Sequence, residues 1–193
     1  MRRAELVRTT SETAIALALD LDGTGAADVS TGLPFFDHML NAFARHGRFD
    51  LTVEAAGDIA VDAHQTVEDV GIVLGAVLKQ ALGEGRGIRR FGFAAVPMDE
   101  ALAQAAIDCG GRAYLVFDAQ FSGHTVGGMD VSLVRHFLES VCQHGGCTLH
   151  LSAYGRNNHH VAEAIFKAVG VALRSAVALE PGNDSVPSTK GVL

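Results

Sequence analysis

The sequence contains no tryptophan and only three cysteines, Cys109, Cys142 and Cys147. These cysteines form no CxxC pair, and an odd number of them cannot all be joined by disulfides within one chain. A disulfide framework is therefore excluded as the basis of the fold, and we interpret the cysteines as structural residues. Such cysteine usage is typical of a reducing compartment, so we expect a cytoplasmic protein.

Long hydrophobic runs are also absent. No segment approaches the roughly 18 uninterrupted apolar residues that a membrane helix needs, although 48% of the residues are hydrophobic and 19% are charged. Glu5, Arg8 and Glu12 interrupt the N-terminal stretch where a signal peptide needs apolar residues. Acidic residues outnumber basic ones by 22 to 15, which gives a net charge of -7. We therefore expect neither a membrane nor a nucleic acid as partner.

Apolar spacing predicts alternating strands and helices over 193 residues, a length typical of one domain or of two small halves sharing a core. Glycine and aspartate turns bound the strands, while Pro34, Gly47 and Gly83 suit helix ends. The predicted strands cover residues 14–23, 51–55, 101–109, 113–121 and 148–154. The predicted helices cover residues 33–46, 66–82, 130–144 and 159–178. Both halves are interpreted as ββαβα units.

Two motifs repeat at nearly constant spacing. His38 and His46 lie 98 positions before His136 and His144, and both pairs belong to a predicted helix. His64 lies 95 positions before His159, and each of these histidines opens an apolar helix. We infer an internal duplication.

The duplication predicts a single catalytic domain made of two halves, about residues 1–85 and 93–180, with a C-terminal substrate-binding tail at 181–193. Each sheet and each helix has one apolar face to cover. Two such halves therefore predict an α/β (α+β) sandwich, in which helices pack between two mainly antiparallel four-stranded sheets.

The second half contains residues typical of a metal site. His159 and His160 precede Glu163 by four and three positions, so all three side chains project from neighbouring parts of one helix side. Two imidazoles and a carboxylate suit divalent Zn, Fe or Mn. A single histidine at such a place is more often a hydrogen-bonded structural residue.

The first half repeats this arrangement with one change. His64 and Glu68 have the same spacing, but Gln65 stands where the second histidine is expected. His38 and His136 occupy matching places on the other helix of each half. Because the motif occurs twice, with a matched histidine each time, a pair of related metal sites is favoured over coincidence.

Several cations and a hydroxyl form a second group of candidates. Lys167 follows Glu163 by one helical turn, which a simple Glu–Lys helix pair also explains. The tail combines Ser188 with Lys190, a set that can hold a phosphate. Arg90 and Arg112 lie in glycine-containing turns. Taken singly, each of these cations is typical of a solvated surface.

Together these residues resemble the imidazoleglycerol-phosphate dehydratase family of histidine biosynthesis. The resemblance covers nearly the whole chain, and its motifs are Arg8–Thr13, Leu33–Leu40, His64–Asp69, Asn158–Glu163 with Lys167, and Pro187–Leu193. It implies dehydration of D-erythro-imidazole glycerol phosphate to imidazole acetol phosphate. It also implies two Mn²⁺ ions per subunit, held at subunit contacts, and a 24-subunit cage.

The resemblance implies a role for each matching residue. The implied metal ligands are His38, His64, Glu68, His136, His159, His160 and Glu163. Glu12 resembles the family's acid/base residue, and the implied substrate and phosphate contacts are Glu12, Arg90, Arg112, Lys167, Ser188 and Lys190. The family usually has a second histidine where this sequence has Gln65. Our hypothesis is that both metals remain and that one is bound more loosely.

The reaction explains this residue set. The hydrogen to be removed lies on a carbon with no adjacent carbonyl, so an ordinary base finds it too weakly acidic. Bound metals would favour the imidazolate form of the substrate, which could then expel the neighbouring hydroxyl to form a diazafulvene. A carboxylate then handles the carbon proton, and Glu12 is the candidate. The candidate catalytic residues are Glu12, Glu68 and Glu163.

Two other functions use similar residues. Gln65 suggests a non-catalytic metal-binding paralogue of the same assembly, but a decayed site is expected to lose its carboxylates and phosphate contacts as well. Those residues are present. A metallohydrolase that uses metal-bound water shares the ligands but leaves the phosphate-type tail unexplained.

Overall fold

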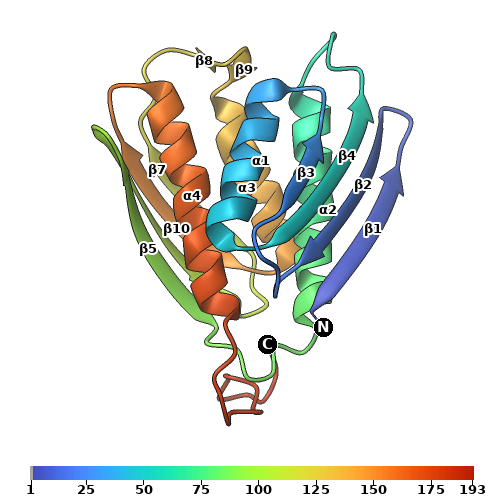
Figure 1. The fold of residues 1–193 in the computed structure, drawn as a ribbon, viewed down its shortest axis with the longest axis vertical. Coiled ribbons are helices and arrows are strands. Elements are labelled where there is room, and N and C mark those ends of the chain that lie inside the picture. The colour runs from blue at the N-terminus through green and yellow to red at the C-terminus, as the bar shows by residue number, and fades with distance from the viewer. Residues whose placement is uncertain (1) are drawn as a thin grey trace.

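The computed structural model describes residues 2–193, in which two four-stranded sheets enclose a layer of helices (Figure 1). One sheet contains β1 (Arg3–Thr9), β2 (Thr13–Asp20), β3 (Ala27–Ser30) and β4 (Asp50–Gly57). The other contains β5 (Phe91–Met98), β6 (Ala101–Asp108), β7 (Tyr114–Ala119) and β10 (Thr148–Tyr154). The helices are α1 (Pro34–Gly47), α2 (His64–Leu82), α3 (Ser132–Gly145) and α4 (Asn158–Val177), and β8 (Thr125–Val126) and β9 (Met129–Asp130) form a hairpin. The predicted sandwich is confirmed.

The two sheets have the same topology. Their strand orders are β1-β2-β4-β3 and β5-β6-β10-β7, with a parallel last pair and antiparallel pairs before it. Asp20 pairs with Asp50, and Asp108 pairs with Thr148. Since Asp20 and Asp108 are 88 positions apart, the β1–β2 and β5–β6 hairpins correspond at that spacing.

Each half contains one strand more than the ββαβα order that the sequence predicts, and in the first half neither β1 nor β3 lies within a predicted strand range. The order in both halves is βββαβα, leaving aside the short β8–β9 hairpin within the second. The edge strand β1 alternates exposed and half-buried residues, and Arg3, Glu5 and Arg8 lie along it. It therefore lacks the apolar alternation by which strands are recognised. Strand β5 begins at Phe91, in the interval between the predicted halves 1–85 and 93–180.

The helices pair across the halves. Helix α1 packs on α4, and α2 packs on α3. A Cβ atom at Gly170 of α4 would lie 2.5 Å from the carbonyl oxygen of Phe43 in α1. A Cβ atom at Gly75 of α2 would lie 2.6 Å from the carbonyl oxygen of Val141 in α3. These glycines, 95 positions apart, permit the two close helix contacts.

Aromatic packing joins the helix pairs at the centre of the molecule. The ring of Phe137 lies 5.1 Å from that of Phe36 and 5.5 Å from that of Phe166, measured between centroids. All three side chains are buried. Three helices are thereby fixed to one another through a single cluster.

The ends of the sandwich differ in what they carry. The four helices of the described chain begin at the same end, and the C-terminal tail lies at the other (Figure 1). The first turns of all four helices therefore share one face of the molecule. Within residues 2–193, no helix has both the length and the apolar character needed to cross a membrane.

Candidate metal sites and substrate cleft

Helices α2 and α3 bring together the first His/Glu group, which consists of His64, Glu68 and His136. One potential ligand atom from each residue lies within 4.8 Å of those of the other two. Nε2 of His64 is 3.7 Å from Oε2 of Glu68, and Nε2 of His136 is 3.4 Å from the same oxygen. The imidazole rings stack at a centroid distance of 4.3 Å. We name these three residues the α2/α3 group.

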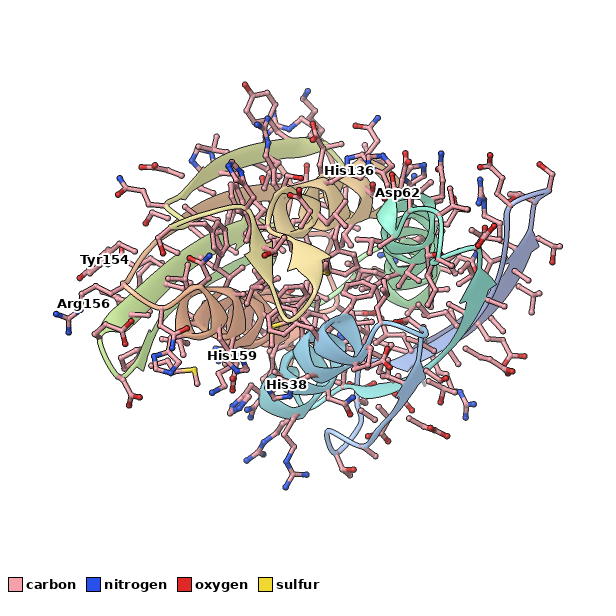
Figure 2. The ribbon with its side chains drawn as sticks, turned by 90° about the horizontal axis from the view of Figure 1, so that it is seen from above. His38, Asp62, His136, Tyr154, Arg156 and His159 are labelled. Carbon is pink, nitrogen blue, oxygen red and sulfur yellow. The ribbon has the colours of Figure 1, made fainter. Side chains whose placement is uncertain are left out.

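Helices α1 and α4 form the matching α1/α4 group, which consists of His38, His159 and Glu163. Nε2 of His38 is 3.2 Å from Oε2 of Glu163, and Nε2 of His159 is 3.0 Å from that oxygen. Both groups lie at one end of the molecule but on different sides of the helical layer, as the labels His136 and His38 indicate (Figure 2). Each group joins a histidine of one half to the histidine and glutamate of the other.

Lys167 lies against the α1/α4 group. Its Nζ is 2.7 Å from Oε1 of Glu163, and the Glu163 side chain is only 11% exposed. Burial opposes ionisation of Glu163, but Lys167 and the hydrogen bonds with His159 and His38 outweigh it and hold the pKa at about 2. Glu163 is therefore an anion over the whole neutral range. Lys167, for which the resemblance implies a substrate contact, pairs with this carboxylate within the chain.

The donor sets fit a divalent transition metal. In each group two imidazole nitrogens converge on one carboxylate oxygen, a mixture that suits Mn, Fe or Zn. Nε2 of His136 is buried and has no hydrogen-bond partner among the described residues. Because a buried polar atom without a partner is costly, this nitrogen is a place where a cation would supply the missing contact.

His160 stands apart from both groups. Its Nδ1 lies 2.8 Å from Oε2 of Glu100, and its Nε2 is 3.8 Å from the nearest carboxylate oxygen of Asp99. The contact with Glu100 raises the pKa of His160. The hydrogen bond to His160, together with backbone N–H donors, lowers the pKa of Glu100 to about 2. At the matching place of the first half, Gln65 is exposed to solvent.

Glu12 lies in the turn between β1 and β2. Within residues 2–193 its carboxylate has no hydrogen bond or ion pair with protein, whereas its backbone N–H donates to Thr10 Oγ1 at 3.1 Å. The next residue, Thr13, donates its hydroxyl to the buried carboxylate of Asp69, which also pairs with Arg8. Asp69 follows Glu68 directly, so this network ties the Glu12 turn to the α2/α3 group.

Arg90 and Arg112 meet Ser188 and Lys190 of the tail in a cleft at the other end of the molecule. The cleft has a volume of about 380 Å³, and its polar lining includes Arg90, Arg112, Ser188 and Lys190. Arg90 donates to Asp108 at 2.7 and 3.0 Å, which raises the pKa of the guanidinium, and to the carbonyl of Pro187 at 2.9 Å. The Arg112 side chain is 80% exposed. An anion can thus reach several cations in one cleft.

Within one chain, the His/Glu groups and the cationic cleft lie far apart. Helix α4 carries His159 and Glu163 of the α1/α4 group in its first turns and ends near the tail, so the part of the helix from Glu163 to Val177 separates them. At 1.5 Å per residue these 14 steps correspond to about 21 Å.

Sequence reasoning missed Asp69, Asp108 and Glu100. Each acts through a partner distant in the chain, which no local motif records. One feature of the sequence could have indicated Glu100. It lies 88 positions after Glu12, which is the spacing of the two corresponding hairpins.

Comparison with known proteins agrees with this geometry. A family model described as imidazoleglycerol-phosphate dehydratase matches residues 31–173. The chain is 59% identical over 193 residues to the imidazoleglycerol-phosphate dehydratase of Methanoculleus marisnigri, and all of both chains is covered. It is 58% identical over 194 residues to that of Acidiphilium cryptum, with 100% of this chain and 99% of the relative covered.

Solved structures of proteins with the same name share the fold. The protein from Pyrococcus furiosus in complex with (S)-C348 matches with a TM-score of 0.84 and 34% identity, covering 97% of this chain and 100% of that one. The protein from Staphylococcus aureus matches with a TM-score of 0.83 and 35% identity, covering 92% and 99%. On the strength of its full-length relatives and of these folds, the chain belongs to the imidazoleglycerol-phosphate dehydratase family.

Proposed function

We propose that this protein dehydrates D-erythro-imidazole glycerol phosphate to imidazole acetol phosphate in histidine biosynthesis, in the cytoplasm. The observation that carries the proposal is the pair of matched His/His/Glu groups in a chain of this family. A substrate with an imidazole at one end and a phosphate at the other needs metal ligands and cations, and the chain supplies both.

Two Mn²⁺ ions per subunit are the proposed cofactors. The α1/α4 group and the α2/α3 group would each hold one ion, and His160 supplies a further imidazole. When bound, Mn²⁺ acts as a Lewis acid that stabilises negative charge on the substrate imidazole. Gln65 offers at most a neutral amide oxygen where His160 offers imidazole, so we propose that one of the two ions is held more weakly.

Glu12 is the proposed acid/base residue. Its carboxylate is exposed and free of protein partners among the described residues, so it can accept and return a proton at the reacting carbon. The Thr13–Asp69–Arg8 network fixes the turn that carries it. Glu68 and Glu163 act as metal-binding carboxylates, and Lys167 keeps Glu163 ionised.

The cationic cleft is the proposed phosphate site. Arg90, Arg112, Ser188 and Lys190 would fix the phosphate and thereby orient the reacting carbon. In this proposal the chain is a single catalytic domain of two duplicated halves, about 1–85 and 93–180, and the tail at 181–193 binds substrate. Lys167 joins the substrate contacts from the side of the α1/α4 group.

The separation of the two sites supports an assembly. About 21 Å of helix α4 separates the α1/α4 group from the cleft of its own chain, which is too far for one small substrate, so in this proposal a second copy completes the site. His160, outside both groups of its own chain, is available to a neighbouring copy. The second sheet exposes Phe91, Phe93, Tyr114 and Tyr154, each 59–65% accessible, a surface suited to contacts between subunits. We propose the 24-subunit cage of the family.

A direct assay tests the proposal. Chelator-treated protein is supplied with imidazole glycerol phosphate, with and without Mn²⁺, and imidazole acetol phosphate is measured. Product that forms only when Mn²⁺ is added to the protein supports the dehydratase function. Folded, metal-loaded assemblies that give no product would instead support the non-catalytic metal-binding paralogue, which the intact carboxylates and cationic cleft otherwise disfavour.

A further inference from the structure

Two glutamates occupy the same place in the duplicated fold and have different surroundings. Glu12 lies in the β1–β2 turn, and Glu100 lies in the β5–β6 turn 88 positions later, at the spacing set by the strand register. Glu12 leaves its carboxylate free among the described residues. Glu100 uses both of its carboxylate oxygens.

The contacts of Glu100 converge on the start of α4. Its Oε1 accepts hydrogen bonds from the backbone N–H groups of Arg156 at 3.0 Å and Asn157 at 2.8 Å. Its Oε2 lies 2.8 Å from Nδ1 of His160. Asn157 in turn caps α4 by accepting the backbone N–H of His159 at 2.9 Å. One carboxylate therefore holds both the loop before the helix and the imidazole on its first turn.

We infer that Glu100 is a positioning residue, which fixes the orientation and the tautomer of His160 so that Nε2 is presented as a metal ligand. The inference deepens the proposed function and rests on it. Glu100 does not contact substrate in this assignment, because it acts through His160.

The tautomer follows from the hydrogen-bonding capacity of the two groups. An ionised carboxylate accepts hydrogen bonds and donates none, so Nδ1 of His160 must carry the proton it shares with Glu100. In the neutral imidazole the lone pair then lies on Nε2. Carboxylates commonly hold metal-binding histidines in this way, raising the basicity of the ligand nitrogen.

The described residues of the first half show no such arrangement. Gln65 stands at the place of His160, and the equivalent carboxylate of Glu12 is left for proton transfer. The same turn thus supplies the proposed acid/base carboxylate in the first half and the carboxylate that positions His160 in the second half.

The variant Glu100→Gln separates positioning from simple support of the helix. The glutamine carbonyl can still accept the two backbone N–H groups, which places its NH₂ against Nδ1 of His160. Nδ1 must then accept that hydrogen bond, so the proton moves to Nε2 and blocks the metal lone pair. We expect the affinity for Mn²⁺ at one site to fall by about 10- to 100-fold, with little change in the midpoint of thermal unfolding.

The measurement is a titration of chelator-treated protein with Mn²⁺, followed by the EPR signal of the free ion. Asp50→Asn is the matched control, since Asp50 accepts three backbone N–H groups and has no hydrogen bond or ion pair with a histidine among the described residues. It should leave Mn²⁺ affinity unchanged. In a His160→Ala background Glu100→Gln should have no further effect on affinity, because the two act as a unit.

Mn²⁺ binding by Glu100→Gln equal to that of the unchanged protein would overturn the inference, as would an additive effect in the His160→Ala background. If the variant loses stability, ¹⁵N NMR of His160 in the unchanged metal-free protein decides: a proton on Nδ1 supports the inference, and a neutral ring protonated at Nε2 contradicts it. None of these measurements requires turnover. Failure of the dehydratase, seen as normal metal binding without product, is therefore distinct from failure of this inference.

Discussion

The α1/α4 and α2/α3 groups have the same donors but different surroundings. In the α1/α4 group Lys167 forms an ion pair with the carboxylate of Glu163, whose side chain is 11% exposed. The corresponding residue 95 positions earlier is Ile72, and Glu68, which is 33% exposed, has no ion pair with a lysine in the described part of the chain. The turn carboxylate is bound to His160 in the second half and free in the first. Duplication therefore supplies the ligands twice, while the residues around them specialise each half.

The largest expected effect comes from changing the free turn carboxylate. Glu12→Gln keeps the shape of the side chain but removes its ability to take a proton, so turnover should fall by about 10²- to 10⁴-fold. Mn²⁺ binding should persist, because Glu12 belongs to neither His/Glu group. Substrate binding should persist, because glutamine keeps the shape of the side chain. Steady-state kinetics, combined with binding of substrate to the variant, measures both. Unchanged turnover would remove Glu12 from the mechanism.

The carboxylates of the two groups come next. Glu163→Gln and Glu68→Gln each replace an anionic ligand by a neutral amide. Each variant should therefore bind one Mn²⁺ ion more weakly, by more than the roughly 10- to 100-fold loss of affinity that is typical when an outer-shell partner is changed. Each variant should keep the other ion, because the ligand sets share no residue. Metal analysis after equilibrium dialysis against Mn²⁺ counts the ions that remain. Loss of both ions from either variant would contradict two separate sites.

Gln65→His should reduce the difference between the halves. An imidazole is a stronger ligand than an amide oxygen for these ions. The weaker of the two Mn²⁺ sites should therefore tighten by about tenfold, equivalent to about 1.4 kcal/mol. The Mn²⁺ titration should change from two steps toward one. Identical titrations before and after the substitution would show that residue 65 does not ligate metal.

The histidine spacing predicted two matched motifs but not how they combine. His38 and His136 were recognised as equivalent, yet each joins the ligands of the other half. That exchange depends on the pairing of α1 with α4 and of α2 with α3, which Gly170 and Gly75 permit by close backbone contact. Helical periodicity identifies a buried face but does not identify the helix that covers it.

The missed strands and Glu100 have a related cause. Strand β1 is an edge strand that alternates exposed and half-buried residues. It is recognised by its hydrogen bonds to β2 and not by the hydropathy of its sequence. The role of Glu100 depends on Arg156, Asn157 and His160, more than 50 positions away. The four helices were predicted closely because apolar spacing and terminal glycines are local signals.

The smallest expected effect compares the far ends of the two sheets, where Asp50 and Thr148 are equivalent. Asp50 accepts the backbone N–H groups of the 24–26 turn, and these hydrogen bonds, led by Ala26 and Thr24, lower its pKa. A carboxylate with a lowered folded-state pKa adds stability that is complete above its unfolded pKa of about 3.9 and disappears as the pH falls through the folded value. Asp50→Asn should therefore cost about 1 kcal/mol at pH 7, and the difference should narrow below about pH 4.

Thr148→Val is the matched change in the second half, where the hydroxyl donates to the carbonyl of Arg112 at 3.0 Å. A neutral hydrogen bond does not titrate, so its loss should cost about 0.5 to 1 kcal/mol at every pH tested. Urea unfolding of each variant against the unchanged protein, repeated from pH 7 to pH 3, gives both differences. The other carboxylates titrate alike in all three proteins, so their contributions cancel in the difference of unfolding free energy between each variant and the unchanged protein. A stability difference for Asp50→Asn that stays constant with pH would show that its hydrogen bonds do not depend on the charge, and the two halves would then be alike at this end.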